Sequence, residues 1–484
     1  MTNPDRLTGL DASFLALEDT GAHMHVGSCM LFEGRAPDYD AFVSQLESRM
    51  HLVPRYRQKL AFPPLAQARP VWVDDPHFNA GYHVRHTALP EPASLEQLRN
   101  LTGRVLAQRL DRTKPLWEIW LVDQVEGGRF ALISKTHHCL VDGVSGVDIA
   151  TVLFDLEADP PPPPEPAPAW SPRPEPSVAA LIADAVTERA SAPLDAARAA
   201  TSALAHPDRT AATLIGAAGA LGSVLAAGLQ AAPASPYNTP IGPHRRFAWV
   251  DGELDRFKAI KGALGGTVND VVLTAVTGAL RAHMLANGHR PDGVELKAMV
   301  PMSVRAEDEK GALGNRVSTM YAPLPVHAAD VIERFAIVHG AMAGLKESGQ
   351  AVGAELITQM SGFAPPTLLA QAARLQSRQR MFNLTVTNVP GPQFPLFLLG
   401  RRLLRLYPQV PLANNTALGI AIMSYDGTIN FGLLADYDAL PDLDALADML
   451  RASIQELEAV AGLPARNGHA SSASAPGARP AVRR

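Results

Sequence analysis

Short apolar runs and amphipathic segments alternate along the first 157 residues, and this pattern predicts strands and helices in turn. The apolar runs are rich in strand-forming side chains, whereas the longer segments repeat their apolar positions at helical spacing. Asp38 or Asp40 is suited to begin the first of these helices. The predicted strands are residues 25–34, 111–123 and 129–136, and the predicted helices are residues 38–50 and 94–110.

The same alternation resumes near residue 241 and continues to about residue 462. Here the pattern predicts a helix that begins beside Asn269 and Asp270, several buried strands, and a hairpin that turns at Asp426-Gly427. The predicted helices are residues 265–288 and 440–460, and the predicted strands are residues 295–305, 315–326, 381–392 and the two arms of 417–436.

A different composition separates these two parts. Residues 159–176 are so dense in proline that they cannot join a helix or a sheet interior, so we expect an extended, exposed linker. Alanine-rich crossover helices follow, and residues 211–232 are uncharged and long enough to span a bilayer. Spanning, attachment to a lipid surface and internal packing all remain open for that piece. The predicted units are therefore residues 1–157, 158–240 and 241–462, with a disordered tail at 463–484.

Length, composition and charge narrow the class of protein. A chain of 484 residues suits two domains of about 200 residues each plus connections. A net charge of −5 without a long basic run argues against a nucleic-acid partner. Only Cys29 and Cys139 are present, which favours a reducing compartment, and residues 1–14 lack the features of a signal peptide. We therefore expect a cytoplasmic protein.

The candidate chemistry lies in residues 135–146, KTHHCLVDGVSG, where a buried strand ends. Because a strand turns alternate side chains to opposite faces, one of His137 and His138 should face the chemistry while the other packs. An imidazole can take a proton from a hydroxyl and return it to a leaving group. Two adjacent histidines do not supply a metal-ligand set, and no GxSxG turn surrounds Ser145. Structural histidines are the alternative, but Asp142 and Gly143 behind the pair favour a site.

HHCLVDG fits the HHxxxDG signature of acyltransferases that use thioesters, and the chain resembles one branch of them, the bacterial wax ester synthase/diacylglycerol acyltransferase family. Peptide-synthetase condensation domains share this signature, but further matches run in order through roughly residues 5–460. The resemblance implies an α/β (α+β) fold of two chloramphenicol-acetyltransferase-like lobes, each a mixed sheet flanked by helices, with a tunnel between them. The further matching segments are LDASFLALED (10–19), MHVG (24–27), PLW (115–117), ND (269–270), VPMSVR (300–305), NVPGP (388–392) and SYDGTINFGLLAD (424–436).

For a thioester and a hydroxyl as substrates, the mechanism follows from what the reaction needs. A thioester already has a good leaving group, so no acyl-enzyme is needed; the protein must hold the two substrates together and take the hydroxyl proton. His138 is assigned as general base and His137 as an orienting or packing residue. The resemblance implies that Asp142 forms a buried ion pair with an arginine, and Arg57 or, failing that, Arg305 is the expected partner. Asp142→Ala should lose fold and activity together, because breaking a buried pair from one side costs roughly 3–5 kcal/mol.

Substrate-binding residues are carried over from two other matching motifs. The resemblance places Asn269 and Asp270 on the active-site face, although either side chain could simply cap a helix. It places Pro115, Leu116 and Trp117 near the cavity for the acyl chain or alcohol, although ordinary core packing also explains them. A further element mixes bulky apolar residues with three arginines, which fits a membrane surface or a sheet edge equally. These arginines are Arg401, Arg402 and Arg405.

The expected activity is long-chain acyl transfer from acyl-CoA to diacylglycerol, to a long-chain alcohol, or to both. Acyl-CoA would be a substrate, and neither a cofactor nor a metal is expected. The alternatives are a condensation-type acyltransferase that uses another thioester donor, and a non-catalytic lipid-binding or lipid-droplet protein. Peripheral contact with the inner membrane or with lipid bodies is a further expectation, while acceptor preference, acyl length and oligomeric state stay open.

Overall fold

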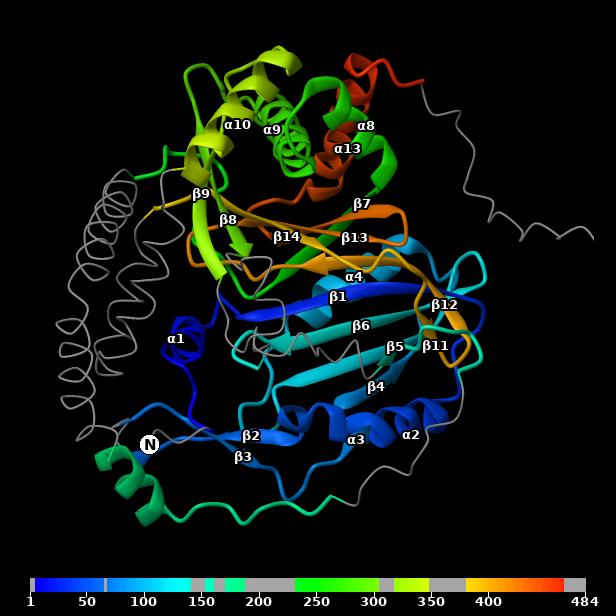
Figure 1. Ribbon diagram of the computed structural model, residues 1–484, viewed down its shortest axis with the longest axis vertical. Helices are drawn as coiled ribbons and strands as arrows, with labels where there is room; N and C mark the ends of the chain where they lie inside the picture. Colours follow the sequence, from blue (N-terminus) through cyan, green and yellow to red (C-terminus); the bar gives the residue numbers. More distant parts are fainter. Residues whose placement is uncertain are drawn as a thin grey trace, which may run out of the picture.

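The computed structural model describes residues 5–64, 68–140, 153–160, 170–187, 231–303, 317–347 and 380–464. Two six-stranded sheets lie one above the other, each with helices on its outer face (Figure 1). The strand orders are β11-β12-β1-β6-β5-β4 and β7-β14-β13-β10-β8-β9, and each sheet contains both parallel and antiparallel neighbours. The expected mixed α/β architecture with two sheet-and-helix lobes is confirmed.

The first lobe is built mainly from the N-terminal part of the chain. Its helices α2 and α3 cover the lower face of the sheet in Figure 1, while α1 lies beside the left-hand ends of β1 and β6. The elements are α1 (Gly9–Leu17), β1 (His25–Glu33), α2 (Tyr39–Arg49), η1 (Met50–Leu52), η2 (Pro54–Arg57), β2 (Gln58–Ala61), β3 (Val71–Asp74), α3 (Ala80–His83), β4 (Val84–Thr87), α4 (Leu95–Ala107), β5 (Trp117–Val125) and β6 (Arg129–His137).

The second lobe carries its helices on the upper face of its sheet (Figure 1). Its core is formed where α9 and α13 pack together against that sheet. Its elements are β7 (Arg245–Glu253), α8 (Leu254–Leu264), α9 (Val268–Ala286), β8 (Leu296–Ser303), β9 (Val317–Leu324), α10 (Val331–Glu347), β10 (Leu384–Pro390), β13 (Leu418–Tyr425), β14 (Thr428–Asp436) and α13 (Leu443–Val460). The same part of the chain also contains β11 (Phe397–Leu398) and β12 (Arg401–Gln409), which lie in the other sheet.

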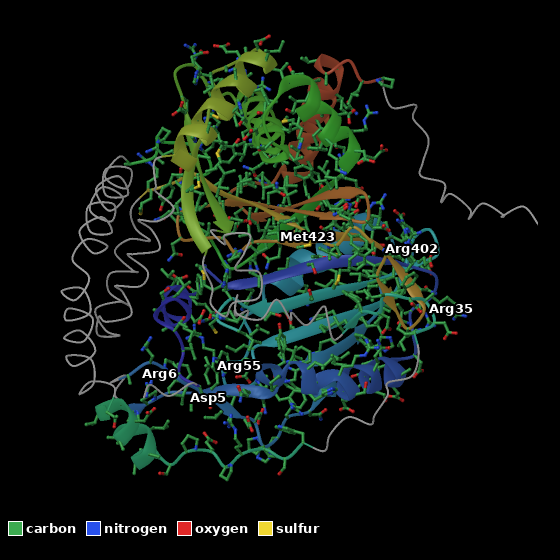
Figure 2. The ribbon with its side chains drawn as sticks, viewed as in Figure 1. Asp5, Arg6, Arg35, Arg55, Arg402 and Met423 are labelled. Carbon is green, nitrogen blue, oxygen red and sulfur yellow. The ribbon has the colours of Figure 1, made fainter. Side chains whose placement is uncertain are left out.

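One segment of the later chain belongs to the first lobe's sheet. β12 pairs antiparallel with β1, and the short strand β11 forms the edge beyond it. Of the two interpretations left open for the arginine-containing element, the structure therefore favours a sheet edge. Arg402 pairs with Asp426 at 2.7 Å, and Figure 2 shows Arg402 and Arg35 at the end of the lobe opposite α1. The predicted division of the chain near residue 240 does not account for β11 and β12, which come from the later chain but join the first lobe's sheet.

The two lobes share a hydrophobic core rather than a simple contact. β1, β5 and β6 pack one face against α4, and the same cluster contains side chains from β7, β12 and β14. The rings of Trp249 and Tyr407 stack at 4.5 Å within it. Gly432 lies so close to the backbone of Pro408 that a Cβ atom would meet the Pro408 carbonyl oxygen at 1.8 Å. Such close packing fixes β12 against β14.

Polar side chains at helix ends set the element boundaries. Asp38 caps α2 as the sequence predicts, and Ser94 forms a reciprocal capping box with Gln97 at the start of α4. Within the described part of the chain no single helix is long and apolar enough to cross a bilayer; α8 and α9, bent by 96° at their junction, pass that test only together. Residues 141–152, most of the alanine-rich region and the tail lie outside the described residues.

Candidate active site

The histidine pair lies where β6 ends. His137 is the last residue of the strand and stands opposite His25 of β1. Two strands can approach closely here because Gly27 has no side chain: a Cβ atom would meet the Ser134 carbonyl oxygen at 2.1 Å. The chain then turns, because the amide of Leu140 donates to the carbonyl of His137 at 2.9 Å. The turn carries His138 out of the sheet.

His137 is buried and both of its ring nitrogens are hydrogen-bonded. The amide of Cys139 donates to Nδ1 at 3.1 Å, and Nε2 lies 3.1 Å from Oε2 of Glu18. Since Nδ1 accepts, the proton of the neutral ring must be on Nε2 and is donated to the carboxylate. Burial lowers the pKa of His137, while the bond to Glu18 opposes that shift. This ring is packed and fully partnered.

His138 is partly exposed, in contrast to its neighbour. Its ring stacks on Phe14 with centroids 4.1 Å apart, and its amide donates to the carbonyl of Met24 at 2.7 Å. Nδ1 is buried and has no hydrogen-bond partner among the described residues. Burial lowers the pKa of His138 to about 4, so the ring is neutral at physiological pH. A neutral, partly exposed imidazole can accept a proton.

The PLW segment lies directly against the histidines through its backbone. The amide of His137 donates to the carbonyl of Leu116 at 2.9 Å. Trp117 is fully buried, donates its indole N–H to the carbonyl of Tyr56 at 2.8 Å, and stacks on His83 at 4.5 Å. These contacts support the core-packing interpretation of Trp117. Pro115 and Trp117 also line a hollow with Lys114 and His83.

Asn269 and Asp270 have separate surroundings at the start of α9. Asp270 accepts from the amide of Thr267 at 2.8 Å, and the Thr267 hydroxyl accepts from the amide of Asp270, which forms a capping box. Its Oδ2 also lies 2.9 Å from Nδ1 of His339. Asn269 instead makes a long 3.5 Å contact with Asn388 of β10. The helix-capping interpretation therefore accounts for Asp270, whereas the side chain of Asn269 contacts β10.

The expected ion pair of Asp142 stays a prediction. Asp142, Gly143 and the alternative partner Arg305 lie outside the described residues. Arg57 ends the short helix η2, and its guanidinium lies 4.6 Å from the ring centre of Trp170. Its Nε is buried without a hydrogen-bond partner among the described residues. Among the described residues, Arg57 stacks on Trp170, and the nearby Asp74 carboxylate opposes the effect of burial, which lowers the pKa of Arg57.

Two contacts of the histidine pair could not be assigned from the sequence. Both come from α1: Phe14 stacks on His138 and Glu18 accepts from His137. The signal was the matching segment LDASFLALED, which contains both residues but does not by itself say what they touch.

Among the described residues, no group of three or more His, Cys, Asp or Glu side chains is placed to hold a metal ion.

The chain matches two domain models of one protein family. The model of the wax ester synthase/diacylglycerol acyltransferase catalytic domain matches residues 7–272, and the model of the WS/DGAT C-terminal domain matches residues 313–458. A probable diacylglycerol O-acyltransferase, tgs1, of Mycobacterium tuberculosis strain H37Rv is 33% identical over 469 residues, which cover 94% of this chain and 96% of that protein. A second one, tgs2, is 33% identical over 463 residues, which cover 94% and 98%.

Solved structures agree. The wax ester synthase/diacylglycerol acyltransferase from Marinobacter aquaeolei VT8 superposes with a TM-score of 0.66 at 28% identity, covering 95% of this chain and all of that one. The first condensation domain of the calcium-dependent antibiotic synthetase reaches 0.57 at 18% identity, covering 95% and 97%, and shares the fold alone. The first family model includes the histidine pair and the second includes β12, and the chain belongs to the wax ester synthase/diacylglycerol acyltransferase family.

Proposed function

We propose that this protein transfers a long-chain acyl group from acyl-CoA to diacylglycerol, to a long-chain alcohol, or to both. The observation that carries the proposal is the state of His138: partly exposed, neutral because burial lowers its pKa to about 4, and held at the end of β6. The names of the relatives, which are diacylglycerol O-acyltransferases and a wax ester synthase, supply the substrate class.

The reaction needs one base that exchanges a single proton. The hydroxyl oxygen of the acceptor attacks the thioester carbonyl, and His138 takes the hydroxyl proton as the new C–O bond forms. Nδ1 is buried, so Nε2 is the nitrogen for this exchange. The carbon–sulfur bond then breaks, and the same proton passes to the departing thiolate. The products are the ester and free CoA thiol, and no acyl-enzyme forms.

Release of CoA thiol tests the activity. Purified protein is mixed with palmitoyl-CoA alone, with diolein, and with hexadecanol, and the free thiol is measured. We expect release that depends on an acceptor and rises with its concentration. Release without any acceptor would show a thioesterase, and no release with either acceptor would contradict the proposal.

We infer that the protein acts in the cytoplasm at a lipid surface, because both candidate acceptors partition into lipid. The helix of residues Val178–Thr187 supports this inference. It is held to the protein by the buried side chains of Leu181 and Ala185 and by an ion pair between Arg6 and Asp184, and three apolar side chains point outward at four-residue spacing. These are Val178, Ile182 and Val186.

Vesicle sedimentation tests this location. We expect the wild-type protein to sediment with phosphatidylcholine vesicles that contain diolein, and the triple variant V178S/I182S/V186S to remain in the supernatant. Acyl transfer to detergent-dispersed diolein should be unchanged in the variant. Equal sedimentation of the two proteins would exclude this helix as the contact.

A further inference from the structure

Helix α1 presents two side chains to the histidine pair. Thr8 caps its N-terminus by accepting from the amide of Asp11, and Leu15 packs into the core. Phe14 and Glu18 are four residues apart, so they lie on the same side of the helix end. Phe14 stacks on His138, and Glu18 accepts from His137. One short helix therefore contacts both imidazoles.

Glu18 is a buried carboxylate with several charged or polar donors. Its side chain is 2% exposed. Arg112 donates to Oε2 from Nη2 at 2.6 Å and from Nε at 3.2 Å, and Arg109 donates to Oε1 at 3.2 Å. Burial acts to raise the pKa of Glu18, but the hydrogen bonds from His137 and Arg112 outweigh it and hold the pKa well below its usual range. The carboxylate is therefore ionised at neutral pH.

The positive charge beside Glu18 comes from arginine rather than from histidine. Nε2 of His25 lies 4.0 Å from Oε1, but burial holds the pKa of His25 well below its usual range. His23, whose ring lies 5.7 Å from that of His25, has its pKa lowered to about 4, again mainly by burial. The imidazoles around Glu18 are therefore neutral, and Arg109 and Arg112 balance its charge.

The Glu18 carboxylate and the Cys139 amide both favour the proton of His137 on Nε2. With Nε2–H directed at the carboxylate, Nδ1 is free to accept the amide of Cys139 at 3.1 Å. That second bond ties the ring to the turn that carries His138. A His137 ring with its proton on Nδ1 would set two donors against each other at the Cys139 amide. The orientation of His138 thus depends on a bond made one residue earlier.

We propose that Glu18 is a positioning residue for acyl transfer: its carboxylate fixes the tautomer of His137 and thereby holds the turn that presents His138. This inference rests on the proposed function, since it assigns Glu18 a part in the reaction of His138. Phe14, on the same helix, limits the ring of His138 from the side. Glu18 itself touches no reacting atom in this scheme.

The variant E18Q tests the proposal with little change of shape. Glutamine can still accept one hydrogen bond but loses the charge that directs His137 and balances the arginines. We expect kcat with palmitoyl-CoA and diolein to fall about 10-fold or more, as happens when supporting partners of metal-bound histidines are lost, while KM for palmitoyl-CoA stays within about 2-fold. E47Q is the matched control, because Glu47 is an exposed carboxylate on α2, and its kinetics should equal wild type.

Histidine-ring NMR supplies a readout that does not depend on activity. In protein labelled with ¹⁵N-histidine, the His137 signals are identified by their loss in H137Q. We expect the Nε2–H pattern in wild type and in E47Q, and a shifted or mixed pattern in E18Q. Should E18Q fail to fold because two arginines lose their counter-charge, the double variant E18Q/R112M removes one of them and takes its place.

The kinetic and NMR measurements test the positioning role of Glu18 separately from the proposed acyl-transfer activity. Unchanged kcat together with an unchanged His137 pattern in folded E18Q would overturn the positioning role. A lower folded fraction with normal kcat per folded molecule would make Glu18 merely structural and would also overturn it. If the wild-type protein releases no thiol with either acceptor, the proposed function fails, while the NMR result still decides whether Glu18 sets the tautomer.

Discussion

Both lobes contain carboxylates in contact with histidines, and two of these pairs, one from each lobe, differ in what surrounds them. In the first lobe, Glu18 and His137 lie 3.1 Å apart and are 2% and 1% exposed. In the second, Asp270 and His339 lie 2.9 Å apart, but His339 is 46% exposed. The first pair adjoins a further imidazole, that of His138, whereas the second closes the start of a helix. A carboxylate–histidine contact alone therefore does not identify a site.

The second pair is already committed to local structure. Oδ2 of Asp270 accepts from the amide of Thr267, which satisfies a donor that the first turn of α9 leaves unpaired. His339 adds a contact from α10 and stacks on Phe335. In the first lobe, the partly exposed His138 follows the buried, fully hydrogen-bonded His137. The contacts of Asp270 and His339 form no such pair of histidines. The comparison thus predicts chemistry in the first lobe and stability in the second.

The largest expected effect is a loss of activity on removing His138, which removal of His339 should not cause. H138A should lower kcat for thiol release by at least about 10²-fold, because it removes the base that takes the hydroxyl proton. H339A should keep near-normal kcat, because that ring only supports a helix start. Thiol release from palmitoyl-CoA with the preferred acceptor measures both. Near-normal transfer by folded H138A would end the assignment of His138.

The pH dependence of the rate is the second test. Burial lowers the pKa of His138 from its ordinary value of 6.5 to about 4, so the base remains unprotonated well below neutral pH. We expect kcat/KM to stay level as pH falls from 8 through 6.5 and to decline only as pH approaches 4. A decline centred near 6.5 would show an ordinary exposed imidazole and would remove the contrast with a surface histidine.

Stability should change over the same range, and the rates need that control. His23, His83 and His138 each have their pKa lowered from 6.5 to about 4, chiefly by burial. Between these values the unfolded chain binds more protons than the folded one, so the free energy of unfolding decreases as pH falls from 6.5 to 4. Tryptophan fluorescence at each pH distinguishes lost fold from a protonated base.

Local patterns were enough to predict most elements and the histidine pair. Helical spacing and Asp38 place α2, an apolar run places β6, and Asp426-Gly427 places the hairpin between β13 and β14. These features depend on neighbours within a few residues, which the sequence displays directly. The position of His138 at the end of a buried strand follows for the same reason.

Two features could not be predicted, because they depend on contacts between distant segments. Glu18 and His137 are 119 residues apart, and an acidic residue at a helix end is far more often solvated. The arginine-containing strand β12 has a pattern that suits either a sheet edge or a membrane surface, and only its pairing with β1 decides between them. Asp270 was ambiguous in another way, since the same side chain suits a cap and a substrate contact.

The smallest expected effect is on stability, and it tests whether Asp270 caps α9 or contacts a substrate. D270A removes the acceptor for the Thr267 amide and the contact with His339, so it should lower the free energy of unfolding by about 1 kcal/mol, as loss of a helix cap does. The kcat per folded molecule should stay at the wild-type value. Urea unfolding and thiol release measure the two quantities, and D292A, at an exposed aspartate, serves as control. If D270A is as stable as D292A but loses kcat, then Asp270 acts on a substrate, and the contrast between the lobes gives way to a site with parts on both.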